Sequence, residues 1–263
     1  MTETIIDLQS WFKTPAGRYL LAWERVHLDE AVADIFGYHA LQLGVPELNA
    51  LHSNRMPHQW LATEQLHTEA SDASLPVTFL SDYSALPFPA SSLDLLVLPH
   101  TLEFSADPHA TLREVARVLV PEGRVVICGL NPLSLWGLRQ YRGHLCKKVG
   151  MGSLYLPDAG QFIGYWRLRD WLRLLGFEVE IGRFGCYRPA VQAEQWLQRF
   201  GWMDAVGQRW WPIFGAAYFL VAVKRVRGIR LLGPSWKTAP VRTAAPVSVA
   251  NRHEHTNKME ERN

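Results

Sequence analysis

Short apolar runs that alternate with helix-like segments constrain this chain more than any other feature of its sequence. The clearest run, Leu93–Leu98 (LDLLVL), is typical of a strand that is covered on both faces. A helical segment follows it, with Asp107 as a candidate N-cap and Pro108 at the first helical position. After a turn at Pro121–Gly123 comes another apolar run, Arg124–Cys128. Strands that alternate with helices predict an α/β fold with a mostly parallel sheet.

Further segments continue this alternation toward both ends of the chain. Apolar residues at helical spacing predict a helix over residues 18–36 and another over 168–175. The other strands are expected at 38–43, 59–64, 77–81, 177–183 and 217–225. The last two are expected to pair antiparallel. The pattern therefore predicts a mostly parallel seven-stranded sheet with an antiparallel last strand.

Changes in composition divide the chain into three parts. Residues 1–37 are expected to form an N-terminal helical extension, 38–227 the α/β domain and 228–263 a disordered tail. Within the domain, residues from about 190 to 211 are rich in Trp and are expected to form a helical insert. Its tryptophans could form a lid over an apolar or aromatic substrate. They could also pack against the sheet, which is the commoner use of Trp.

Composition and charge argue against several classes of protein. Lys and Arg number 27 and Asp and Glu 25, so a net charge of +2 gives no reason to expect nucleic acid or an anionic membrane as a partner. The longest apolar run, residues 213–223, is shorter than the roughly 20 residues that cross a bilayer as a helix. The three cysteines lie far apart without the spacing of zinc ligands, which predicts reduced thiols, no metal site and a cytoplasmic protein.

The stretch 79–130 carries the most informative motifs. Asp82 is followed by Leu-Pro-Phe at 86–88, His100 follows the strand 93–98, and residues 112–123 read LREVARVLVPEG. In their order and spacing these motifs resemble class I S-adenosylmethionine-dependent methyltransferases of the type 11 group. The resemblance covers roughly residues 38–225. It implies the Rossmann-like sandwich of that family.

The resemblance also implies S-adenosylmethionine as the cofactor, at the carboxyl ends of the strands. Asp82 is implied to accept a hydrogen bond from the adenine amine, although a loop Asp also commonly caps a turn. Tyr83 could pack on the base, and Glu64 is the candidate for the ribose hydroxyls. Pro99 and His100 are implied to contact the methionine part and the substrate. His100 is in addition the candidate general base.

The loop after the first strand departs from the family's glycine-rich pattern, D/E-x-G-x-G-x-G. Gln42 stands where an acid is usual, and only Gly44 remains of the glycines. Val45 adds bulk, Pro46 lacks an N–H donor, and Glu47 brings negative charge toward the cofactor's own carboxylate. Gly44 is still assigned to the cofactor site. The N–H groups of a following helix are expected to meet that carboxylate.

The sequence therefore predicts an S-adenosylmethionine-dependent methyltransferase that acts on a small-molecule acceptor. The alternative is a catalytically inactive methyltransferase-like module that binds or regulates. A third possibility is a nucleic-acid modifier, because residues 228–263 carry six basic and three acidic side chains. No membrane partner is expected, and the sequence leaves the oligomeric state open.

Overall fold

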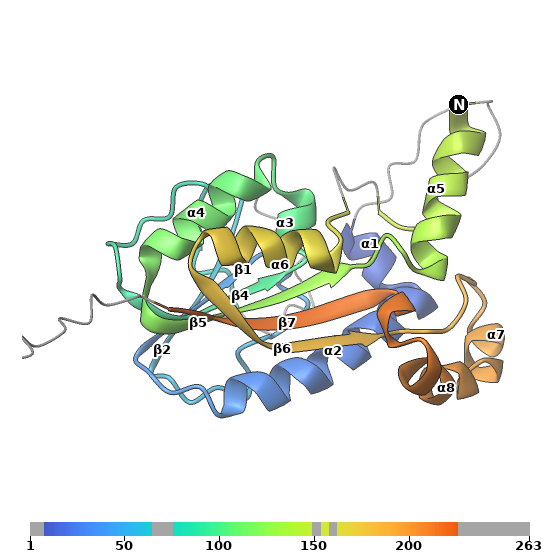
Figure 1. Ribbon diagram of the computed structural model, residues 1–263, viewed down its shortest axis with the longest axis horizontal. Helices are drawn as coiled ribbons and strands as arrows, with labels where there is room; N and C mark the ends of the chain where they lie inside the picture. The colour runs from blue at the N-terminus through green and yellow to red at the C-terminus, as the bar shows by residue number, and fades with distance from the viewer. Residues whose placement is uncertain (1–7, 65–75, 149–153, 158–161, 226–263) are drawn as a thin grey trace, which may run out of the picture. The chain divides into compact units, whose positions relative to one another are not determined.

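The computed structural model of the protein describes residues 8–64, 76–148, 154–157 and 162–225 (Figure 1). The chain separates into two compact units, residues 1–226 and 227–263. All described residues belong to the first unit. The predicted disordered tail lies outside the described residues and stays a prediction.

Seven strands form one sheet in the order β3-β2-β1-β4-β5-β7-β6. In chain order they are β1 (His39–Leu43), β2 (His58–Thr63), β3 (Phe79–Leu80), β4 (Leu93–Pro99), β5 (Leu119–Leu130), β6 (Phe177–Gly185) and β7 (Ala217–Lys224). Neighbouring strands among β1 to β5 pair in parallel, whereas β7 is antiparallel to both β5 and β6. The predicted fold class is confirmed, including the antiparallel last strand.

Side chains cap the first turns of two of the described helices. The described helices are α1 (Leu8–Phe12), α2 (Pro15–Ala33), α3 (Thr101–Phe104), α4 (Pro108–Val118), α5 (Leu135–Lys148), α6 (Tyr165–Leu174), α7 (Glu194–Arg199), α8 (Trp202–Trp210) and the 3₁₀ turn η1 (Pro212–Phe214). α4 begins as predicted, because the Asp107 side chain accepts from two N–H groups of the first turn. α2 begins earlier than predicted, because the Thr14 hydroxyl accepts from the N–H of Gly17 at 3.1 Å.

Helices cover both faces of the sheet (Figure 1). α2 packs on one face, where Leu28 and Val32 share a core with Ala40 and Val97 of the strands. α4 and α6 pack on the other face. Residues 44–57 are all described and form turns without a helix between β1 and β2. The N-terminal helix α2 therefore covers a face of the sheet that the β1–β2 connection leaves without a helix.

The carboxyl ends of β1, β2, β4 and β5 lie at one edge of the sheet, where α1, α5, α7 and α8 also gather (Figure 1). The Trp-rich segment is helical, as predicted. Its Trp196, Trp202 and Trp210 are exposed, so the interpretation that they pack against the sheet is wrong. Among the described helices, none has the length and apolar character needed to cross a bilayer.

Candidate functional site

A cavity of about 250 Å³ lies at the carboxyl ends of β1, β2 and β4. The sheet's strand order reverses between β1 and β4, and this is where open α/β sheets bind their ligands. Five of the six residues predicted to bind the cofactor line it: Gly44, Glu64, Tyr83, Pro99 and His100. They come from four separate chain segments, one at the end of each of the first four strands.

Asp82, the sixth predicted residue, is exposed and does not line the cavity. Its Oδ1 accepts from the backbone N–H of Ser84 at 2.7 Å and from the Ser84 hydroxyl at 2.8 Å. These bonds lower the pKa of the Asp82 carboxyl. The side chain caps a turn in this structure. Its contact with adenine stays a prediction.

Glu64 and Tyr83 form one side of the cavity. Burial raises the pKa of Glu64, the nearby charge of Asp82 adds to the rise, and the Tyr83 N–H opposes it by donating to the carboxylate. Tyr83 is buried, and its hydroxyl oxygen lies 3.1 Å from the position that a Cβ atom on Gly44 would occupy. A Cβ atom at Gly44 would therefore be in tight contact with the Tyr83 hydroxyl. Gly44 also has a φ of +78°, which favours glycine.

The side chain of Gln42 is hydrogen-bonded to the backbone of the loop after β1. Its Nε2 donates to the carbonyl oxygens of Gly44 at 3.0 Å, Val45 at 2.9 Å and Leu48 at 2.7 Å. Its Oε1 accepts from the N–H of Ala50 at 2.9 Å. A carboxylate could accept the last bond but could donate none of the other three. Gln42 therefore belongs to a loop whose carbonyl groups turn inward, which differs from the glycine-rich loop of the family pattern.

This loop changes what the protein can offer a cofactor. Val45 is buried in the core beside α2, and it lines the cavity together with Pro46 and Glu47. No helix begins in residues 44–57, so the expectation that helical N–H groups follow Gly44 is wrong. The physical reason is that Gln42 binds the carbonyl groups of a non-helical turn and that α2 already covers this face of the sheet.

His100 lies between two carboxylates at the inner end of the cavity. Its Nε2 is 2.8 Å from Oε1 of Glu24 on α2, and its Nδ1 is 2.9 Å from Oε2 of Glu103 on α3. The contact with Glu24 is an ion pair by distance rather than an aligned hydrogen bond. Each of the three side chains is at most 1% exposed.

These contacts fix the protonation of His100. Burial by itself lowers the pKa of the ring, but attraction to Glu24 and the hydrogen bond to Glu103 outweigh it and raise the pKa to about 10. The ring is therefore an imidazolium at neutral pH. Both of its nitrogens face carboxylates, which leaves none to accept a further proton. Burial also raises the pKa of Glu103, whose other oxygen accepts from the N–H of Leu130.

Glu24 is the residue that sequence reasoning missed. A glutamate on a surface helix is usually solvated, and its partner His100 is distant in the sequence. One signal was available. Glu24 lies one turn after Leu20 and one turn before Leu28, so it is on the apolar stripe of α2 that faces the sheet. Position on that stripe predicts burial, and a buried carboxylate needs a partner.

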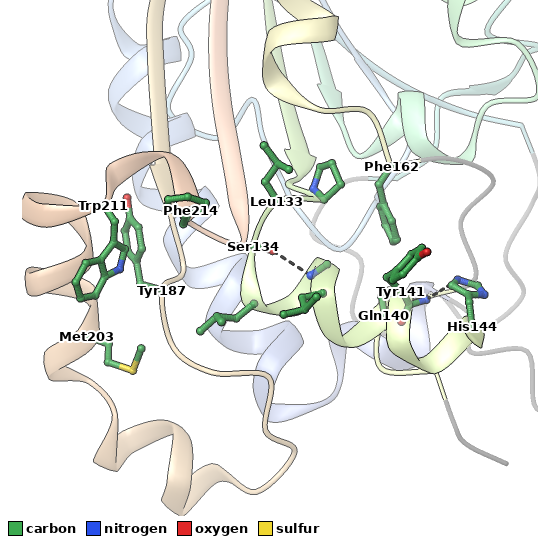
Figure 2. A pocket seen from close by; sticks show the side chains of 14 residues that line it. Leu133, Ser134, Gln140, Tyr141, His144, Phe162, Tyr187, Met203, Trp211 and Phe214 are labelled. Atoms are coloured by element: carbon green, nitrogen blue, oxygen red, sulfur yellow. Dashed lines mark hydrogen bonds between the residues drawn. The ribbon is translucent and has the colours of Figure 1, made fainter. Parts of the chain in front are cut away.

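A second, larger cavity of about 920 Å³ lies at the end of β5 (Figure 2). One wall is formed by the first turns of α5 and the segment before it, together with Phe162. The opposite wall is formed by Tyr187, Met203, Trp211 and Phe214. The sequence indicated a lid formed by the Trp-rich segment as one possibility, and Met203 and Trp211 of that segment line this cavity.

The comparison with known proteins agrees with this architecture. A model of the methyltransferase domain family, type 11, matches residues 57–127. The uncharacterized protein YafS of Escherichia coli strain K12 is 34% identical over 180 residues, which cover 67% of this chain and 68% of YafS. The chain belongs to the class I S-adenosylmethionine-dependent methyltransferase family.

Two other known proteins are similar to this chain. The biotin biosynthesis bifunctional protein BioHC of Saccharophagus degradans is 30% identical over 159 residues, which cover 57% of this chain but only 27% of BioHC. An S-adenosylmethionine-dependent methyltransferase of Thermotoga maritima shares the fold, with a TM-score of 0.55, 16% identity and coverage of 82% of this chain and 94% of that one. Membership of the class I methyltransferase family implies the use of S-adenosylmethionine.

The residues around the smaller cavity fit such a cofactor in three respects. An acidic side chain, Glu64, lies at the end of β2, where the ribose hydroxyls are expected. The Tyr83 ring also lines the cavity, and Gly44 has no side chain that would extend toward the Tyr83 hydroxyl. The fit is poorest at the loop Val45–Glu47, which offers fewer N–H donors than the class I methyltransferase pattern.

Proposed function

We propose that the protein is an S-adenosylmethionine-dependent methyltransferase that acts on a small molecule and holds its cofactor in the cavity beside His100. The observation that carries this proposal is the gathering of Gly44, Glu64, Tyr83, Pro99 and His100 around one cavity. When bound there, S-adenosylmethionine supplies a methyl group for in-line transfer to a nucleophile. Such a reaction depends above all on the alignment of donor and acceptor.

Each residue has a role that follows from its position. The Glu64 carboxylate accepts hydrogen bonds from the two ribose hydroxyls. The Tyr83 ring, which stays neutral because burial raises its pKa, packs against the adenine base. The free oxygen of Asp82 accepts from the adenine amine while its other oxygen continues to cap Ser84. Together these groups orient the nucleoside and leave the methyl group near the end of β4.

We assign His100 a positioning role. The two ion pairs fix the ring between Glu24 of α2 and Glu103 of α3, so His100 holds the start of α3 against α2. The sequence-based prediction that His100 is a general base requires Nε2 to leave Glu24 first. An acceptor whose nucleophile is already deprotonated, or whose proton leaves to water, needs no such rearrangement.

The experiment is a calorimetric titration of the full chain with S-adenosylmethionine. We expect one saturable site, and we expect Glu64→Gln to weaken binding by about tenfold or more, because charge-assisted hydrogen bonds to the ribose are lost. Glu178→Gln is the matched control, since Glu178 lies exposed on the edge strand β6. Equal losses in both variants would contradict the assignment of Glu64.

The alternative, a methyltransferase-like module without catalysis, is favoured by one set of observations. The cavity of about 250 Å³ is slightly smaller than typical pockets for drug-sized ligands, about 300–1,000 Å³. Val45 and Pro46, which replace residues of the glycine-rich pattern, line it. The same titration separates the two functions. A folded protein that binds no S-adenosylmethionine at millimolar concentration would support the inactive module.

A further inference from the structure

The larger cavity, at the end of β5, is lined mainly by apolar and aromatic side chains. Five of its fourteen lining residues are aromatic, and none is Asp, Glu, Lys or Arg. The aromatic residues are Tyr141, Phe162, Tyr187, Trp211 and Phe214. They come from both walls of the cavity, and Met203 lies on the same wall as Trp211 (Figure 2). Its volume of about 920 Å³ lies within the range of about 300–1,000 Å³ that is usual for small-molecule sites.

The buried polar groups of the wall are already hydrogen-bonded within the protein. The Ser134 hydroxyl donates to the carbonyl of Asn131 at 2.7 Å, and its oxygen accepts from Gly137 at 3.1 Å. The amide oxygen of Gln140 accepts from the backbone N–H groups of Tyr155 at 3.0 Å and of Leu156 at 2.9 Å. A charged ligand group buried against this wall would have to displace these bonds or lose its hydration without compensation.

The Tyr187 hydroxyl is engaged in the same way. It donates to the carbonyl of Pro212 at 2.7 Å, so this ring presents its apolar face to the cavity. Gly207 of α8 packs directly on the ring, where a Cβ atom would lie 2.4 Å from Cγ. The close packing fixes the distance between α8 and Tyr187.

Two sets of polar contacts fix the wall formed by α8 and η1. The Asp204 carboxylate of α8 accepts from the Tyr19 hydroxyl and pairs with Nε of Arg188 at 2.9 Å. The Asn131 side chain donates to the carbonyls of Ile213 at 2.8 Å and Gly215 at 2.9 Å, which ties η1 to the end of β5. The cavity is therefore preformed, and ligand binding would cost little free energy for ordering its side chains.

Apolar side chains around the cavity are nonetheless left in contact with solvent. Leu138 on α5 is 55% exposed and Phe214 on η1 is 49% exposed, although both line the cavity. Leu133, before α5, is 60% exposed. A concave group of exposed apolar side chains on a preformed wall is typical of a binding site rather than of a solvated surface. A ligand that covers them would gain the corresponding hydrophobic free energy.

We propose that this cavity binds one uncharged aromatic small molecule. The aromatic side chains favour offset or edge-to-face contacts with a ring system, and the described residues of the lining include no Asp, Glu, Lys or Arg, with His144 as their one basic side chain. The cavity opens at the same edge of the sheet as the cavity beside His100, since both lie at carboxyl ends of parallel strands. If the proposed function holds, this ligand is the methyl acceptor. That last step alone rests on the proposed function.

The test is a fluorescence titration of the full chain with N-phenyl-1-naphthylamine, an uncharged aromatic probe, in the absence of S-adenosylmethionine. We expect saturation at one probe per chain. Leu138→Glu and Phe214→Glu, one on each wall, are expected to weaken binding by about tenfold or more, because each places a charge in the apolar cavity. Both positions are half-exposed, so the variants should fold, and circular dichroism checks this.

Leu174→Glu provides the matched control, because Leu174 is 85% exposed on α6 and does not line the cavity. We expect the control to bind the probe like the wild type. A loss in the control equal to that in the two cavity variants, or binding that does not saturate, would overturn the proposal.

Phosphatidylcholine vesicles provide a second arm. We expect the protein not to sediment with them. Sedimentation that Leu138→Glu and Phe214→Glu both abolish would mean that this face docks on a membrane, and it would overturn the proposal. Because neither arm contains the cofactor, a failure to bind S-adenosylmethionine would leave the result for this cavity unchanged.

Discussion

The Glu24 carboxylate lies 2.8 Å from Nε2 of His100, and both side chains are almost completely buried. The pair joins α2, near the N-terminus, to the loop that follows β4 and lines the proposed cofactor cavity. With Glu103 on the other ring nitrogen, it forms a buried cluster of three ionisable groups. The position of the cavity wall therefore depends on a helix that precedes the first strand.

Replacing Glu24 by Gln should destabilise the protein strongly. The change leaves the imidazolium of His100 buried with one carboxylate instead of two, and breaking a buried ion pair typically costs about 3–5 kcal/mol. Urea unfolding measures the loss. Glu30→Gln on the same helix is the control, because Glu30 forms an exposed pair with Arg183 and its loss should change little. A Glu24→Gln variant as stable as wild type would show that the pair is not charged.

The stability of the protein should fall as the pH rises above neutrality. The pKa of His100 is raised from 6.5 to about 10 in the folded state, so the folded protein retains a proton that the unfolded chain releases. The stabilisation is complete below 6.5 and is lost as the pH rises through about 10. The raised pKa of Glu103 acts in the same direction, because its folded state also binds a proton more tightly.

Urea unfolding at about pH 6 and about pH 9.5 measures this dependence. The wild type should lose several kcal/mol of unfolding free energy between the two conditions, and His100→Gln should lose much less. Equal losses in the two proteins would contradict the assignment of the proton to His100.

Restoring the acid of the family pattern, Gln42→Glu, should not restore a typical glycine-rich loop. The carboxylate cannot donate to the carbonyls of Gly44, Val45 and Leu48, which share the two N–H groups of Gln42, and the loss of both donors corresponds to about 2 kcal/mol or more of stability. Thermal and urea unfolding check this. The exposed Gln192 offers the control Gln192→Glu, which should be neutral. A stabilised Gln42→Glu variant would mean that the loop can adopt a different path.

Gly44→Ala should weaken cofactor binding and stability together. An alanine at a φ of +78° costs about 1–2 kcal/mol, and its Cβ would press on the Tyr83 hydroxyl at 3.1 Å. Calorimetry with S-adenosylmethionine should show weaker binding, since Tyr83 must move within the cavity. Gly164→Ala is the matched control, because its Cβ would meet only Cγ of Pro132 at 3.7 Å. If both variants bound alike, Tyr83 would not be part of the site.

Much of the fold could be predicted from the sequence because its signals are local. The apolar run at β4 and the Asp107–Pro108 start of α4 each depend on a few adjacent residues. Most of the candidate cavity was implied by the resemblance to class I methyltransferases, which places the cofactor where the carboxyl ends of parallel strands meet at one edge. That resemblance grouped Gly44, Glu64, Tyr83, Pro99 and His100, and all five line one cavity.

The remaining features depend on the path of the chain, which local patterns do not contain. The role of Gln42 exists only because the following loop turns its carbonyls inward. The burial of Glu24 exists only because α2 replaces the missing helix between β1 and β2. One of the two interpretations of the Trp-rich insert, packing against the sheet, is wrong for a related reason. Residue type predicts that Trp contacts apolar surface, but not whether that surface is a core or, as at Trp211, an open cavity.

Hydrogen exchange with and without S-adenosylmethionine tests the central claim most directly, because it locates the cofactor on the chain. We predict slower exchange in residues 43–48, 82–84 and 99–104, which surround the cavity beside His100, and unchanged exchange in α8. Saturating S-adenosylmethionine that leaves 43–48 and 99–104 unprotected, or that protects only the walls of the larger cavity, would contradict the account.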